Sequence, residues 1–224
     1  GALRKVAEMG YENVESAGFF DHSAEEVRQM LTETGLRLSA THSPYKDLRD
    51  NFDETLAFHK KLGNRHYIIP GHKMPDQSEI DDFVRVINDI QPRLEAEGIK
   101  LSFHNHRREH IMNEDGSVIF EQLLYRTNLS FEVDIYWAFT SMNNPLLLMD
   151  RVGDRLSCVH LKDGTADCQS LPLGQGVAPI PEVWEYARKR GIPMVVENTP
   201  TEDRGLAEAK ICIDCLREIE KKAN

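Results

Sequence analysis

Three of the nine histidines in this 224-residue chain lie within seven residues, in the segment SFHNHRREH (102–110). The apolar start of this segment is typical of a β-strand, in which alternate side chains point to the same face. A strand over 101–106 places Ser102, His104 and His106 on one face. Imidazoles at the end of a buried strand act either as metal ligands or as hydrogen-bonded core groups.

Three further predicted strands carry polar residues near their ends. The segments 129–136, 156–162 and 194–199 place on one face, in turn, Glu132 with Asp134, His160 with Lys162, and Glu197. Burying so many ionisable groups together is unfavourable unless they are paired or bind a metal. Two imidazoles with two carboxylates fit Zn²⁺, Mn²⁺ or Co²⁺, and they fit Mg²⁺ less well. The candidate metal ligands are therefore Asp134, His160, Glu197 and one of the pair His104 and His106.

These strands belong to a repeat of one strand and one helix. Glycine adopts the left-handed conformation that ends helices, and Asn128 stands in its place at one junction. Seven strands alternating with helices predict a parallel sheet, and no GxGxxG motif follows any of them, which favours a closed barrel over an open dinucleotide-binding sheet. In a barrel, inward side chains at the C-terminal strand ends meet at the catalytic face. The glycines at the other six junctions are Gly10, Gly35, Gly63, Gly98, Gly153 and Gly191.

An eightfold barrel needs one strand more than the seven that the sequence predicts. The chain begins with ALRKVAEMG, which is already a helical pattern. We therefore expect an α/β fold, a (β/α)8 TIM barrel forming a single domain over residues 1–224. Its first β-strand is missing from the N-terminus, either through truncation or because the barrel is incomplete.

Composition argues against several partners. The formal net charge of −10 is unfavourable for nucleic-acid binding. The chain contains no run of about 18 apolar residues, so no membrane span is predicted. Cys212 and Cys215 form a single CxxC in a helical pattern, which indicates a buried thiol pair and not a zinc site. The segment LGQGV, with Gly174 and Gly176, is either a plain turn or a phosphate cradle of backbone N–H groups.

Several segments in their order along the chain resemble the xylose isomerase-like TIM barrels, and most closely their sugar phosphate isomerase/epimerase branch. They are ALRKVAEMGYENVE, GLRLSATHSPY, FHNHRREH, LSFEVDIYW, VHLKDG, LGQGV and VVEN. The resemblance places the family's first strand before Gly1. It implies one divalent metal ion held by Asp134, His160 and Glu197. The fourth ligand position, usually a glutamate, is His104 here.

The resemblance also implies the chemistry and the remaining site residues. The first hypothesis is isomerisation or epimerisation of a sugar, sugar phosphate or sugar derivative by proton transfer through a metal-stabilised enediolate. Glu197 is then a ligand and the candidate general base, and the acid is Glu109, His42 or Lys162. Substrate contacts are expected from His42, Glu15, His106 and Trp137.

Two alternatives stay open at this point. Because His104 replaces the usual glutamate, a metal-dependent lyase or dehydratase acting on a keto-sugar or keto-inositol is the second hypothesis. The third is a barrel that binds a sugar without turning it over. In each case the expected partner is a small carbohydrate, with no nucleic acid and no membrane, and a homo-oligomer is compatible with the sequence. We expect a cytoplasmic protein, or a periplasmic one if a signal segment preceded Gly1.

Overall fold

A computed structural model describes residues 1–199 and 204–223 of the chain. Seven strands form a parallel sheet in the order β1-β2-β3-β4-β5-β6-β9, and two short strands form a separate hairpin. The strand order follows the chain, as the predicted strand–helix repeat requires. The bounds of the sheet strands are β1 Asn13–Ala17, β2 Arg37–His42, β3 His66–Ile69, β4 Lys100–His104, β5 Ser130–Asp134, β6 Leu156–Leu161 and β9 Met194–Val196, and the hairpin pairs β7 Asp163–Gly164 with β8 Ser170–Leu171.

The helices between the strands begin and end largely where the sequence signals them. Ser23 caps α2 in a capping box with Glu26, and Gly35 ends that helix in the left-handed conformation with φ 72°. Asp76 caps α5 by accepting a hydrogen bond from the backbone of Glu79. The helices are α1 Ala2–Met9, α2 Ala24–Thr34, α3 Tyr45–Asp50, α4 Phe52–Leu62, α5 Gln77–Ala96, α6 Ile119–Arg126, α7 Ile135–Thr140, α8 Pro145–Val152, α9 Ile180–Arg190 and α10 Gly205–Ala223, with short 3₁₀ turns η1 Arg107–His110 and η2 Gly153–Arg155.

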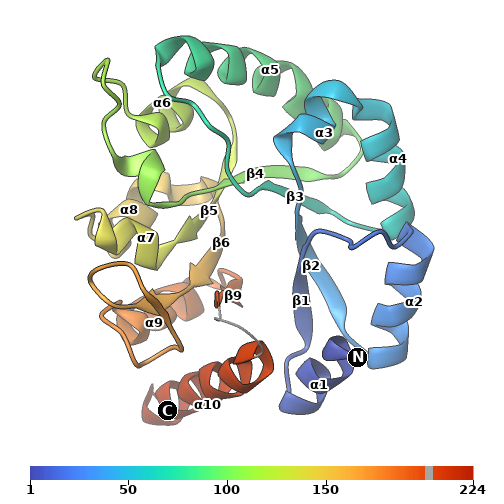
Figure 1. Cartoon of the computed structure of the whole chain (residues 1–224), viewed down its shortest axis with the longest axis vertical. Coiled ribbons are helices and arrows are strands. Elements are labelled where there is room, and N and C mark those ends of the chain that lie inside the picture. The colour runs from blue at the N-terminus through green and yellow to red at the C-terminus, as the bar shows by residue number, and fades with distance from the viewer. Residues whose placement is uncertain (200–203, 224) are drawn as a thin grey trace. The chain divides into compact units, whose positions relative to one another are not determined.

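The chain forms two compact units, and the first comprises Asn13–Glu132. Its strands β1 to β4 pair in parallel, and the register of β4 with β5 sets His104 opposite Glu132. In Figure 1 the helices of this unit lie along one face of its strands. Strand side chains on that face form the core, among them the fully buried Leu101, Phe103 and Phe131. The opposite face of the same strands is left for polar residues.

The second unit comprises Gly1–Glu12 and Val133–Asn224. Strands β6 and β9 pair in parallel within it, and α1 packs against α10. The hydroxyl of Tyr11 donates to the carbonyl of Ala209 over 2.9 Å, and Arg217 donates to the carbonyl of Met9 over 2.8 Å. The first helix of the chain is therefore held by the last.

The two cysteines of the CxxC motif lie on α10. Cys212 is buried and Cys215 is half-buried, and both are free thiols. Burial raises the pKa of both thiols, which keeps them protonated and weakly reactive at neutral pH. The predicted burial of the two thiols is confirmed for Cys212 and only in part for Cys215.

All four strands predicted to carry the polar residues end earlier than the sequence indicated, and β6 ends one residue early, at Leu161. β5 ends at Asp134, because the Asp134 side chain caps α7 and the chain turns into that helix, so Tyr136 is helical and not part of the strand. β4 ends at His104, and His106 lies beyond it at the start of η1. β9 ends at Val196, although the backbone N–H of Glu197 still donates to the carbonyl of Leu161 over 3.0 Å.

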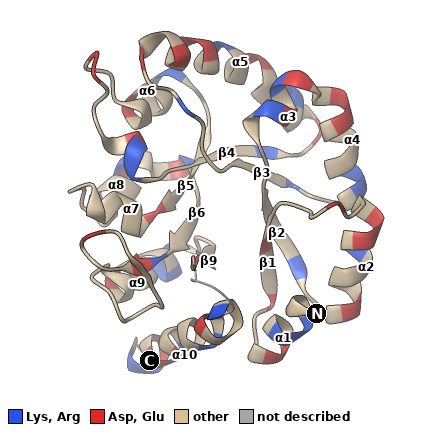
Figure 2. Cartoon of the chain, in the orientation of Figure 1, with Lys and Arg blue, Asp and Glu red and all other residues tan. Residues whose placement is uncertain are grey.

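Charged residues of both signs are interspersed along the helices, as Figure 2 shows for α2, α4 and α5. Such mixing gives many weak surface ion pairs and little net stabilisation. Among the described residues, no helix combines the length and the apolar character that crossing a bilayer requires.

Candidate active site

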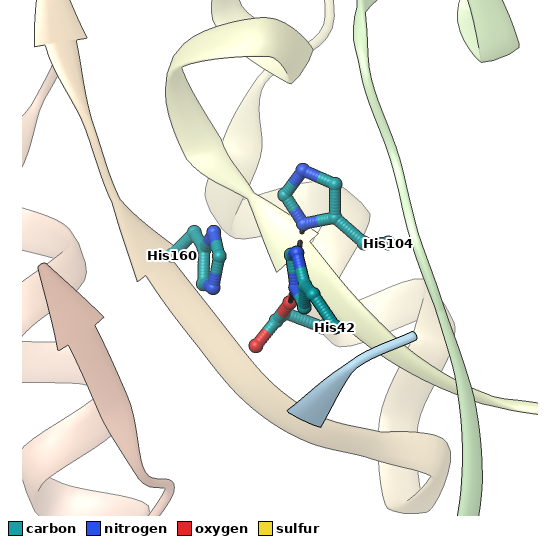
Figure 3. A group of neighbouring side chains, drawn as sticks. His42, His104 and His160 are labelled. Carbon is teal, nitrogen blue, oxygen red and sulfur yellow. Dashed lines mark hydrogen bonds and ion pairs between the residues drawn. The ribbon is translucent and has the colours of Figure 1, made fainter. Parts of the chain in front are cut away.

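The first polar group, which we call the His42 group, lies within the unit 13–132. It consists of His42 at the end of β2, His104 at the end of β4, Glu132 in β5 and Glu15 in β1. Figure 3 labels His42 and His104. His42 Nε2 lies 2.6 Å from Glu132 Oε2 and 3.1 Å from Glu15 Oε1. His104 Nδ1 lies 3.2 Å from the same Glu132 oxygen. One carboxylate thus orients two imidazoles.

The His42 group is shielded from water. Glu132 is 0% exposed and His104 is 1% exposed, whereas the His42 side chain keeps 13% of its surface. The rings of His42 and His104 lie 5.0 Å apart between centroids. Buried carboxylates strengthen every hydrogen bond that they accept. The orientation of the His42 imidazole is therefore fixed while part of the ring stays accessible, so that it can donate or accept a proton.

The predicted residue His106 lies beside this group, immediately before η1, and Glu109 lies within η1. Glu109 is fully buried, accepts from the backbone N–H of His106 over 2.8 Å and receives Arg108 Nη2 at 3.0 Å. The ring of His106 stands edge-on to that of His104, with 4.8 Å between centroids. Glu109 thus stabilises the turn that presents His106, and its role as a proton donor stays a prediction.

The second polar group, which we call the Glu197 group, lies within the other unit. It consists of Asp134 at the end of β5, His160 in β6, Lys162 just after β6 and Glu197 just after β9. His160 Nδ1 and Glu197 Oε2 lie 2.7 Å apart, and Lys162 Nζ donates to Glu197 Oε1 over 3.3 Å. His160 is also labelled in Figure 3. The side chains that strand alternation placed on one face therefore do lie together in this unit.

Asp134 has two tasks in this group. Its Oδ1 accepts the backbone N–H groups of Tyr136 and Trp137, each over 2.9 Å, and so starts helix α7. Burial, and next the negative charge of Glu197, raise the pKa of Asp134 well above its ordinary value. A carboxylate in this position is stabilised by a cation, and His160 and Lys162 supply part of that compensation.

Lys162 is the buried cation of the Glu197 group. It is 1% exposed, and its ammonium also donates to Thr199 Oγ1 over 2.8 Å. It lies 5.7 Å from the centre of the Trp137 ring, within cation–π range. Lys162 is therefore paired with Glu197 and not with its neighbour Asp163.

Asp163 instead binds the LGQGV loop. Its buried carboxylate accepts the backbone N–H groups of Gly164, Gly174, Gly176 and Ala178 over 2.9 to 3.0 Å. An internal carboxylate thus occupies the position that a bound phosphate would need. The plain-turn alternative for LGQGV is correct, and the phosphate-cradle alternative is wrong.

Each polar group has the chemistry of a divalent-metal site. The candidate ligand atoms of His42, His104 and Glu132 lie within 4.8 Å of one another, and so do those of Asp134, His160 and Glu197. Mixed nitrogen and oxygen donors suit Zn²⁺, Mn²⁺ and Co²⁺. The second set fits a cation better, because two carboxylates face one imidazole. Burial, and next the negative charge of Glu197, raise the pKa of Asp134.

Sequence comparison assigns the chain to a family. Residues 3–219 match the xylose isomerase-like TIM barrel family, and the chain belongs to that family. The seven parallel strands and their helices are those of this barrel with its first strand missing, as predicted. No curated protein matches the chain.

Solved structures share the fold. A sugar phosphate isomerase/epimerase from Parabacteroides distasonis is 24% identical, with a TM-score of 0.81 over 96% of this chain and 90% of that one. A second such protein from the same organism is 21% identical, with a TM-score of 0.80 over 96% and 86%. A probable 3-DHS dehydratase of petrobactin synthesis from Bacillus anthracis is 13% identical, with a TM-score of 0.73 over 96% and 92%.

Sequence reasoning did not select Glu132 or Asp163 as functional residues. Glu132 lies two positions before Asp134, so strand alternation already placed it on the polar face. Its pairing with His42 was not predictable, because the two are 90 residues apart. The role of Asp163 depends on a loop that closes over it, and no local pattern signals that closure.

Proposed function

We propose that this protein is a metal-dependent isomerase or epimerase of a sugar or sugar derivative. The observation that carries the proposal is the Glu197 group. It combines a buried aspartate whose pKa is raised, an imidazole and a second carboxylate that is 29% exposed. Glu197 can therefore reach a substrate, whereas the fully buried Asp134 can serve only an ion or the protein.

Asp134, His160 and Glu197 would hold the divalent ion, with His104 as the proposed fourth ligand. When bound, the ion supplies Lewis-acid stabilisation of negative charge that develops on the substrate oxygens. Mn²⁺, Zn²⁺ and Co²⁺ suit this set better than Mg²⁺. The ligand assignment rests on family membership and on the contacts within each polar group.

Proton transfer falls to side chains that remain accessible. Glu197 would remove the proton from the carbon beside the substrate carbonyl, and the Lys162 ammonium, 3.3 Å from Glu197 Oε1, would keep this carboxylate ionised. His42, oriented by Glu132 and Glu15, would return a proton. In this scheme Glu132 positions His42, which is the acid. This arrangement compensates for the replacement of the family's usual glutamate by His104.

The structural relatives support this chemistry only through the activities that their names state. Two are described as sugar phosphate isomerase/epimerases. Their identity to this chain is 21% and 24%, so the transfer of their activity is part of the proposal.

Solvent exchange tests the proposal directly. The metal-loaded protein is incubated in D₂O with panels of aldoses, ketoses and their phosphates, and deuterium at the carbon beside the carbonyl is followed by NMR. We expect incorporation that disappears in Glu197→Gln and in protein treated with EDTA. Tight sugar binding with no deuterium incorporation from any substrate would instead indicate a non-catalytic sugar-binding barrel.

A second candidate is a lyase or dehydratase acting on a keto-sugar or keto-inositol. It is favoured by the imidazole of His104 at the position of a carboxylate, because elimination needs one base and one acid and not a matched carboxylate pair. The structural relative described as a probable dehydratase has the same fold. Incubation with keto-inositols and 3-keto-glycosides, followed by absorbance of an enone product, separates this reaction from isomerisation.

A further inference from the structure

A pocket of about 310 Å³ lies between the loop after β3 and the turn after β4. The two segments leave paired parallel strands, with Ile69 opposite Phe103, so both lie at the carboxyl edge of the sheet. Gly71 adopts φ 141°, which side chains rarely tolerate, and an added Cβ there would lie 3.5 Å from His106 Nδ1. The loop backbone thus rests directly on the His106 ring.

The charged side chains that line this pocket carry one more positive charge than negative charges. Arg108 donates to Glu109 Oε1 over 3.0 Å and also to the carbonyl of His72. The negative charge of Glu109 is therefore neutralised by Arg108, and both residues line the pocket. Lys73 also lines the pocket, and among residues 1–199 and 204–223 its ammonium has no carboxylate partner within ion-pair distance. One positive charge is left over at the mouth of the pocket.

The imidazole of His72 adds a neutral hydrogen-bond donor to the lining. His72 packs against Tyr45, with 4.6 Å between ring centroids, and stacks on Phe83 at 5.6 Å. Burial, and next the charge of Arg49, lower the pKa of His72, so it is neutral at pH 7 and presents one N–H. The ring is fixed in place before any ligand arrives, which reduces the entropy lost on binding.

The pocket adjoins the His42 group through His106, whose ring lies 4.8 Å from that of His104 between centroids. We propose that this pocket binds the anionic group, phosphate or carboxylate, of an acidic sugar whose reacting carbons lie at the His42 group. Lys73 and Arg108 provide charge-assisted hydrogen bonds, and His72 and His106 provide imidazole groups that can hydrogen-bond the anion. This inference rests on the proposed function, because it names the substrate class of the same active site.

The first test measures anion binding without catalysis. Inorganic phosphate is titrated into the EDTA-treated full chain, so that no metal ion can bind it, and the heat is recorded by calorimetry. Lys73→Gln removes the unbalanced charge, and Lys46→Gln on α3, also an exposed lysine, is the matched control. We expect phosphate binding in the parent and in Lys46→Gln, and affinity about tenfold weaker in Lys73→Gln, as for the loss of one charge-assisted bond.

The second test uses the reaction. With the metal-loaded enzyme, Lys73→Gln should raise KM for phosphorylated or carboxylated sugars about tenfold more than it raises KM for neutral sugars. A change confined to phosphates or confined to sugar acids identifies the source of the anion. No phosphate binding in the parent, or equal binding in the parent and Lys73→Gln, overturns the proposal.

The two proposals fail separately. Phosphate binding that depends on Lys73, together with no deuterium exchange on any sugar, would support the proposed anion pocket and refute the proposed isomerase function. Exchange on neutral sugars with no phosphate binding would do the reverse.

Discussion

Asp134→Asn tests whether a cation completes the Glu197 group. Asparagine has the same shape and keeps an oxygen for the N–H groups of Tyr136 and Trp137, so helix α7 retains its cap. It removes the negative charge whose burial beside Glu197 is unfavourable. We therefore expect opposite effects on two properties: metal binding is lost, and the metal-free protein becomes more stable.

The size of the stability change follows from the geometry. The candidate ligand atoms of Asp134 and Glu197 lie within 4.8 Å, and two unit charges at this distance repel by about 3.5 kcal/mol at an effective dielectric constant of about 20. His160 and Lys162 offset part of this repulsion. We expect the free energy of unfolding of the metal-free variant at pH 7 to exceed that of the parent by about 1–2 kcal/mol.

The sign of the pH dependence is also determined. A raised pKa means that folded Asp134 binds its proton more tightly than the unfolded chain does. The metal-free parent therefore loses stability as pH rises from about 4 towards the folded-state pKa. The advantage of Asp134→Asn should vanish near pH 4 and be full once the folded-state pKa has been passed.

Urea unfolding of EDTA-treated protein at several pH values measures the stability, and calorimetry with Mn²⁺ measures the metal affinity, which should fall more than about 100-fold. Asp76→Asn is the matched control, because Asp76 also caps a helix but lies at the surface. It should change neither property by more than about 0.5 kcal/mol. Unchanged Mn²⁺ affinity in Asp134→Asn, or a less stable metal-free variant at pH 7, would refute the reasoning.

Three further predictions concern other parts of the molecule. Glu132→Gln should lower kcat about 100-fold or more, because His42 loses its orienting carboxylate, while elemental analysis shows unchanged metal content; parent-like turnover would contradict this. Asp163→Ala should lower the free energy of unfolding in urea by about 3–5 kcal/mol, since four backbone N–H groups lose their acceptor, and a loss below that of exposed Asp167→Ala would disprove the anchoring role. Burial lowers the pKa of His59 to about 4, so the parent should lose about 3 kcal/mol more than His59→Gln as pH falls from about 6.5 to about 4; parallel losses would show that His59 is protonated in the fold.

The periodic features of the fold were predictable from the sequence. Glycine junctions and alternating apolar runs indicated seven strands of a parallel sheet, and alternation placed Asp134, His160 and Glu197 late in or just beyond their strands. Each of these inferences uses residues close together in the chain, where backbone geometry alone decides which face a side chain occupies.

Strand ends and long-range pairings were not predictable in the same way. Asp134 ends β5 because its side chain caps the next helix, a local competition that apolar periodicity does not register. The Glu132–His42 contact and the closure of LGQGV over Asp163 join residues that only the folded chain brings together. Glu109 illustrates the same limit, because its burial depends on the turn that it stabilises.

The dependence of LGQGV on Asp163 matters for engineering this barrel. A Cβ at Gly176 would lie 2.2 Å from Asp163 Oδ1, so the shape of this segment is specified partly by a residue outside it. Grafting LGQGV onto another scaffold would fail unless the aspartate were transplanted too. Conversely, the side chain of Gln175, between the two anchored glycines, offers a place to vary the surface without disturbing the anchor.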